Sequence, residues 1–92
     1  MQKQRMEKLA QTFPSLQQAQ GLAPWKPDEL AEWAKGFERG TLERTAAQFV
    51  LWVYDPYSDW RCGRFNLLKA LVTWDEPHRE AFLAWAKSPW WA

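Results

Sequence analysis

The feature that most constrains this chain is its aromatic content: eight Trp, five Phe and two Tyr fall within only 92 residues. A chain of this length buries only about 60% of the surface that its unfolded form exposes, so its core has to be efficient. Each buried ring removes about 150–250 Å² from water, which is worth several kcal/mol. A handful of rings is therefore enough for the core, and the full set is too large for it. We expect some tryptophans to lie at the surface, where Trp and Tyr often anchor partners.

Apolar residues recur at helical spacing in segments that proline and glycine separate. The pattern predicts helices over residues 2–13, 27–39, 41–54, 64–74 and 76–87, and a short one over 15–20. The apolar run 49–54 also fits a buried strand, but good helix formers precede it and no second strand is present to pair with it. We therefore predict an all-α fold, a compact bundle of four to five short helices that forms one domain over residues 1–92.

Helix boundaries follow from a few residues. Pro14 ends the first segment, Thr41 is the expected N-cap of the third, and Asp75 is the expected N-cap of the last, with His78 near its side chain. Spacing also predicts a core. Its expected members are Leu30, Trp33, Phe37, Phe49, Trp52, Leu68, Leu71, Phe82 and Trp85. In the segment 64–74 we expect Leu67, Leu68, Leu71 and Trp74 to be buried.

Charge and cysteine content narrow the classes of function. The net charge is +1, which argues against nucleic acid or an anionic membrane as the partner. No apolar stretch approaches the roughly 20 residues that span a bilayer, and no apolar signal core follows the basic start. Cys62 is the only cysteine, which excludes an intrachain disulfide and a multi-thiolate metal site. A lone thiol suits a reducing compartment, so we expect a cytoplasmic protein.

Residues 15–36 contain two stretches, 15–22 and 30–36, that resemble the helix-turn-helix half of MerR-type and excisionase regulators. The resemblance implies that an alanine packs two helices together, and that Leu30 and Trp33 anchor the second of them. It leaves a nucleic-acid-binding regulator as the alternative function, through this degenerate motif or through the basic, aromatic loop 57–69. However, the outer face of the second helix carries Asp28, Glu29 and Glu32, and carboxylates repel phosphates.

The best candidate for a binding site is the loop that follows Asp55-Pro56, together with the C-terminal tail. Arginine beside aromatic rings suits stacking and the capture of carboxylates. Trp60, Trp90 and Trp91 lie outside any helical stripe, so periodicity does not explain them. The expected partner-binding residues are Tyr57, Asp59, Trp60, Arg61, Arg64, Trp90 and Trp91. The opposing interpretation makes Trp60 a core residue, pairs Arg61 and Arg64 with nearby acids, and uses Asp59 as a helix cap.

Catalytic and metal sites find little support in the residues. Asp75 and His78 at i, i+3 supply two ligands where a stable metal site needs three or four, and Cys62 has no nearby base in the sequence. We therefore expect no enzyme activity, no metal and no cofactor.

The function predicted from the sequence is that of a small, tryptophan-rich binding or adaptor protein. Residues 28–43 carry five acids and two bases, a net charge of −3, and residues 57–69 carry one acid and three bases, a net charge of +2. Opposite patches suit protein contacts or self-association better than they suit a polyanion. The tail tryptophans are expected either to close the core or to form a homodimer.

Overall fold

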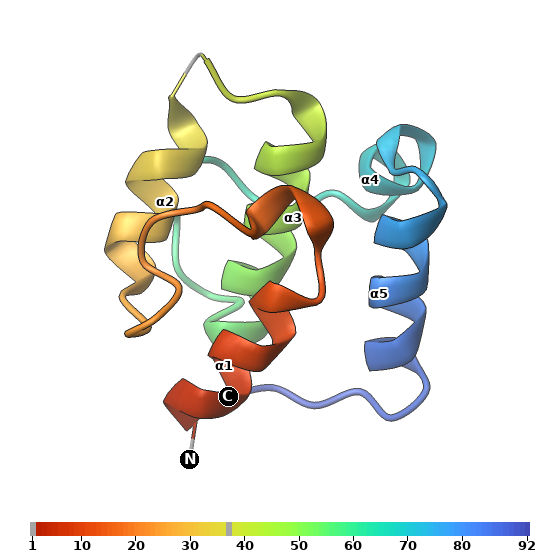
Figure 1. The fold of residues 1–92 in the computed structure, drawn as a ribbon, viewed down its shortest axis with the longest axis horizontal. Helices are drawn as coiled ribbons and strands as arrows, with labels where there is room; N and C mark the ends of the chain where they lie inside the picture. The colour runs from red at the N-terminus through yellow and green to blue at the C-terminus, as the bar shows by residue number, and fades with distance from the viewer. Residues whose placement is uncertain (1, 37) are drawn as a thin grey trace.

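A computed structural model describes residues 2–36 and 38–92, and all of its regular structure is helical, as predicted. The helices are α1 (Gln2–Gln11), a 3₁₀ turn η1 (Pro14–Leu16), α2 (Pro27–Lys35), α3 (Thr41–Tyr54), α4 (Leu67–Thr73) and α5 (Glu76–Ala86). Residues 49–54 belong to α3, so the strand alternative is wrong. In Figure 1, α2 lies on one side of α3, α4 and α5 lie on the other, and α1 lies in front of α3 between them.

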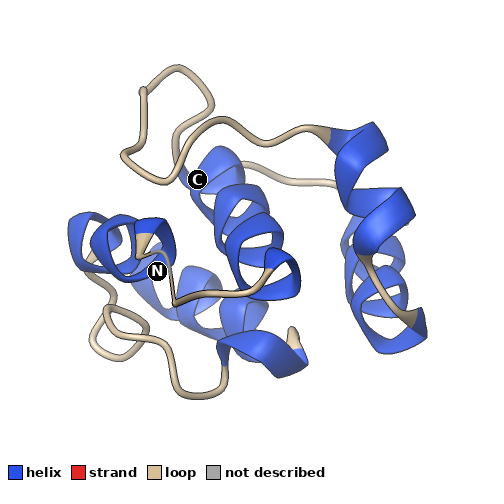
Figure 2. Cartoon of the chain, turned by 90° about the horizontal axis from the view of Figure 1, so that it is seen from above, coloured by secondary structure: helices blue, strands red, loops and turns tan. Residues whose placement is uncertain are grey.

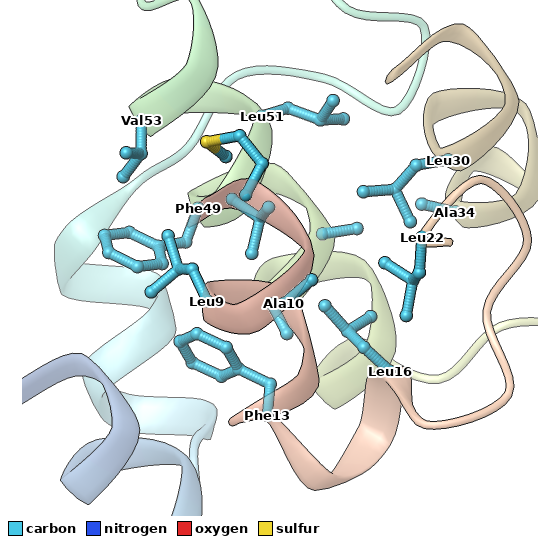
Figure 3. Close-up of a cluster of buried hydrophobic side chains, with 14 of the residues drawn as sticks. Leu9, Ala10, Phe13, Leu16, Leu22, Leu30, Ala34, Phe49, Leu51 and Val53 are labelled. Atoms are coloured by element: carbon cyan, nitrogen blue, oxygen red, sulfur yellow. The ribbon is translucent and has the colours of Figure 1, made fainter. Parts of the chain in front are cut away.

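One part of the molecule, which we call the α1–α2 half, consists of α1, η1, α2 and the face of α3 that they cover. Small and aliphatic side chains make up most of its interior, beside the buried Trp25 and Trp33, and Ala10, Ala34, Ala46 and Ala47 are fully buried. Small residues let helix backbones approach closely, so the aliphatic side chains between the helices interdigitate (Figure 3).

The other part, the α4–α5 half, consists of α4, α5, the tail 87–92 and the facing side of α3. Aromatic rings fill it. Phe49 of α3 lies with its ring centroid 5.4 Å from that of Phe82 and 5.1 Å from that of Trp85, both on α5. Trp74, at the junction of α4 and α5, lies 5.5 Å from Phe13. Helix α4 packs against α3, and Figure 2 shows α4 and α5 standing together on one side of the molecule.

Polar caps fix where the last two helices begin. The Asp75 carboxylate accepts a hydrogen bond from the backbone N–H of His78 at 3.2 Å, which confirms Asp75 as an N-cap. The Asn66 side chain accepts from the backbone N–H of Lys69 at 3.0 Å, so Asn66 begins α4 and Asp59 does not. Helix α3 begins at Thr41 with Gly40 as N-cap, where Thr41 was expected. The Gly40 N–H donates to the Glu43 carboxylate at 2.7 Å.

Three predicted helices are clearly shorter than expected. Residues 15–20 were expected to form a helix, but the structure has only the 3₁₀ turn of η1, followed by turns up to residue 25. The helix predicted over 64–74 covers only 67–73, because the chain is still extended at its cap Asn66. Helix α2 ends at Lys35, with Gly36 as its C-cap, well before Gly40.

The expected core is partly correct. Leu30, Trp33, Phe49 and Trp85 are buried, while Trp52 and Phe82 are half-buried and pack against the core. Phe37 lies outside the described residues. The prediction is wrong for Leu67, Leu68 and Leu71, which are exposed. Only Ala70 of α4 is buried, because aromatic rings already occupy the space that these leucines were expected to fill.

Gly21 shapes the connection into α2. Its φ is +84°, and a Cβ there would lie 2.5 Å from the Lys26 carbonyl oxygen and 2.6 Å from the Leu30 nitrogen. Only glycine fits this close approach, which lets the chain turn tightly against the start of α2. Among the helices of residues 2–36 and 38–92, none is long and apolar enough to cross a membrane.

Candidate protein-binding surface

The most exposed apolar surface lies on α4, opposite the side that contacts the core. We call Leu67, Leu68, Leu71 and Val72 the α4 face. Leu68 is 77% exposed and Val72 84% exposed. Leu68, Leu71 and Val72 are spaced i, i+3, i+4, so they lie together on one side of the helix. Isolated exposed leucines are ordinary, but a contiguous group on a small protein marks an interaction surface.

A groove with a volume of about 440 Å³ adjoins the α4 face. We call it the aromatic groove. It is lined by Trp52, Phe65, Leu67, Phe82, Trp85, Ala86, Pro89 and Trp91. Its walls come from α3, the segment just before α4, α4, α5 and the tail, and all of these side chains are apolar. Leu67 belongs to both the groove and the α4 face, so the two form one continuous apolar surface.

The C-terminal tail forms one wall of this groove because several contacts hold it against the bundle. The Trp85 indole N–H donates to the Trp90 carbonyl at 2.9 Å, and the Ala92 N–H donates to the Val53 carbonyl at 3.2 Å. The Trp91 ring lies edge-on, 5.2 Å from Trp85 and 5.6 Å from Trp52 between centroids. The tail therefore closes one end of the core while Trp91 stays nearly half exposed beside the groove.

Trp90 faces a different neighbour. The Arg5 guanidinium of α1 lies 4.0 Å from the centre of its ring, a distance at which a cation is attracted to the face of an indole. The ring is half-buried and packs against the core. Of the two tail tryptophans proposed from the sequence, Trp91 is thus the one that borders the groove.

The predicted loop site is organised mainly by internal contacts. Arg61 bonds to the Glu32 carboxylate of α2 at 2.6 Å. Arg64 bonds to Asp59 at 2.8 and 3.0 Å. The Arg61 guanidinium lowers the pKa of Glu32 below its ordinary value. Both arginines therefore already have carboxylate partners, as the opposing interpretation expected.

The two aromatic residues of this loop differ from each other. The half-buried Trp60 packs against Tyr54, with 6.3 Å between centroids, and its indole N–H donates to the Asp55 carbonyl at 3.3 Å. Tyr57 is 91% exposed. Of the predicted site residues only Trp91 lines the aromatic groove, whereas Trp60 and Arg64 line a smaller pocket that shares Trp52 and Phe65 with it.

A second cluster joins the two halves through His78, which is only 2% exposed. Its Nδ1 lies 2.6 Å from the Asp75 carboxylate, and its Nε2 lies 2.7 Å from the Ser15 hydroxyl. The Ser15 backbone N–H also donates to Nε2 at 3.3 Å. A nitrogen that accepts this bond carries no proton, so the neutral ring is protonated on Nδ1, toward Asp75. The contact with His78 lowers the pKa of Asp75.

The order carboxylate, imidazole, hydroxyl is that of a nucleophile relay, but the environment points to a structural role. The ring is enclosed by Phe13 and Trp74, at 6.0 and 6.4 Å between centroids. The Ser15 hydroxyl is also within 3.3 Å of the Leu42 carbonyl on α3. The cluster therefore ties η1, α3 and α5 together.

Nucleophile and metal chemistry gain no support from the remaining groups. Burial raises the pKa of the Cys62 thiol to about 11, so it stays protonated at neutral pH. Within the described ranges, no three His, Cys, Asp or Glu side chains gather in a way that could hold a metal ion.

The sequence did contain a signal for the α4 face that the core prediction overlooked. Residues 67–72 are apolar at every position except Lys69. A helix that is apolar nearly all round has more apolar surface than it can bury through the single face that contacts the core. Comparison of the chain with protein-family models, with curated proteins and with solved structures finds no match.

Proposed function

We propose that this protein is a small, non-enzymatic interaction module that binds another protein segment through the α4 face and the aromatic groove. The observation that carries the proposal is the continuity of the two surfaces, which share Leu67 and include the highly exposed Leu68 and Val72. A cytoplasmic location, with Cys62 as a buried free thiol, is part of the same proposal.

The chemistry of the surface favours a helical or extended apolar segment as its ligand. Interfaces draw most of their binding energy from a few well-packed anchors near the centre, and aromatic walls suit such anchors. An amphipathic helix docks into an apolar groove through side chains at i, i+3 and i+4. Here the groove offers rings from α3, α5, the segment just before α4 and the tail.

The alternative function, a nucleic-acid-binding regulator, finds less support in the arrangement of charges. Asp28, Glu29 and Glu32 are exposed on α2, where a recognition helix would present basic or amide side chains. Arg61 and Arg64, which would provide the phosphate contacts of the loop, are paired with carboxylates. We therefore place the binding surface on α4.

Site-specific photo-crosslinking, carried out in the cells in which the protein naturally occurs, tests the proposal. A photo-reactive amino acid replaces Val72 on the α4 face or, as a matched control, Tyr57, which is even more exposed but lies in the loop. We expect protein adducts from position 72 that disappear when Leu68→Glu is added. Adducts from position 57 alone, or adducts from position 72 that survive Leu68→Glu, would contradict the proposal.

A further inference from the structure

We infer that the segment that occupies the aromatic groove is α4 of a second copy of this chain, so that each α4 covers the other copy's groove in a two-fold dimer. This inference rests on the function proposed above, because it uses the same surface. It adds the identity of the partner and the geometry of the contact.

The chain carries both halves of a helix-in-groove contact side by side. Leu68, Leu71 and Val72 provide the i, i+3, i+4 anchors of an amphipathic helix, and the groove begins at the neighbouring Leu67. In a two-fold interface the same patch is used on both subunits, so a contact from residue i to residue j is repeated from j to i. A helix face next to a groove satisfies this condition, since each copy gives an anchor and receives one.

The extent of the apolar surface matches what a dimer needs. Four apolar side chains of α4 are exposed, and the nearly half-exposed Trp91 lines the adjoining groove, so this surface is larger than the scattered apolar residues that are normal on a monomer. A stable interface buries about 800 Å² on each partner, with an apolar centre and a polar rim. The exposed apolar surface supplies that centre, and the polar residues around it supply the rim.

Charge also favours a second copy. Lys69 is the only ionisable residue of α4; it is exposed and lies beside Val72 at i, i+3, at the edge of the α4 face. An α4 that enters the partner's groove can therefore bury Leu68 and Leu71 while Lys69 stays at the solvent-exposed rim, so that no unpaired charge is buried, which would cost several kcal/mol.

Sedimentation velocity of the full chain between 1 and 100 µM tests the inference. We expect a monomer–dimer equilibrium for the unmodified protein and at least a tenfold weaker dimer for Val72→Glu. Tyr57→Glu, the same kind of substitution at an exposed loop position, should leave the dissociation constant unchanged. Circular dichroism checks that each variant is folded, and Leu68→Lys provides a second disruption of the α4 face if Val72→Glu does not fold.

A protein that stays monomeric at 100 µM, or a dimer that Val72→Glu and Leu68→Lys leave intact, would overturn the inference. The crosslinking experiment separates this failure from failure of the proposed function. Adducts from position 72 with a different protein would refute the dimer and keep the binding surface, whereas the absence of adducts at position 72 would refute both.

Discussion

The two halves of the molecule bury apolar surface in different ways. In the α1–α2 half, mainly small and aliphatic side chains pack between the helices, and α2 directs its apolar stripe, which includes Trp33, inward. In the α4–α5 half, large rings fill the interior, and α4 buries only Ala70 while its leucines face outward. The difference indicates that both halves stabilise the fold, the first through close packing and the second through packed rings, but that only the second presents an apolar surface on α4.

The largest loss of stability should follow from removing the Phe49 ring, which lies at the centre of the aromatic rings of the α4–α5 half. Phe49 is fully buried and lies between 5.1 and 6.2 Å from the rings of Phe65, Phe82, Trp85, Trp52 and Trp74. Phe49→Ala should lower the free energy of unfolding by about 3–5 kcal/mol, because it leaves a cavity that rigid rings cannot fill. Urea unfolding measures the change. A loss below about 1 kcal/mol would show that the rings do not depend on one another.

The next largest loss of stability is expected in the α1–α2 half, from a substitution that the backbone conformation of Gly21 does not tolerate. Gly21→Ala should destabilise the protein by about 2–4 kcal/mol, because the positive φ and the contacts with Lys26 and Leu30 leave no room for a methyl group. Gly40→Ala is a matched control, since a Cβ there would have only the end of the flexible Glu43 side chain near it, at 3.5 Å. Equal stability of the two variants would contradict this interpretation of the turn.

A smaller effect should come from the polar link between the halves. Ser15→Ala removes the hydroxyl that lies 2.7 Å from the His78 Nε2 and should cost about 1 kcal/mol, the usual worth of one hydrogen bond. Ser88→Ala, at an exposed position after α5, should have almost no effect on unfolding by urea. If both substitutions are neutral, the link between η1 and α5 does not stabilise the fold.

Acid should weaken the same link. The pKa of Asp75 is lowered in the folded protein by the hydrogen bonds from the His78 side chain and backbone N–H. A carboxylate with a depressed pKa stabilises the fold at pH values above its ordinary pKa, and this contribution is lost as the pH falls through the lower folded value. We expect Asp75→Asn to flatten the decline in thermal stability below about pH 4. An unchanged decline would show that other groups cause it.

The sequence predicts helix positions correctly where local signals determine them. It predicts burial incorrectly where tertiary packing decides which side chains reach the core. Asp75 and Pro27 mark helix starts through their own backbone chemistry, and the structure agrees. The apolar spacing of Leu68 and Leu71 is the same whether they face rings or solvent. Because the rings already fill the interior of that half, tertiary packing decided which apolar face of α4 was left outside.

The candidate site shows the same limit. Exposed tryptophan was a sound expectation, and the structure brings Trp91 to the edge of the aromatic groove. Trp60 and the two arginines looked equally suited in sequence, but Arg61 pairs with Glu32, 29 positions away. A contact between distant segments of this kind leaves no periodic signal in the sequence.

The most direct test of the account compares two leucines, one from each half, in urea unfolding at 1 µM, where dimer formation contributes least. Leu30 of α2 is fully buried, and Leu68 of α4 is 77% exposed. Leu30→Ala should lower the free energy of unfolding by about 2–5 kcal/mol, and Leu68→Ala should change it by less than about 0.5 kcal/mol. Similar losses for both variants would place Leu68 in the core and contradict the existence of an exposed α4 face.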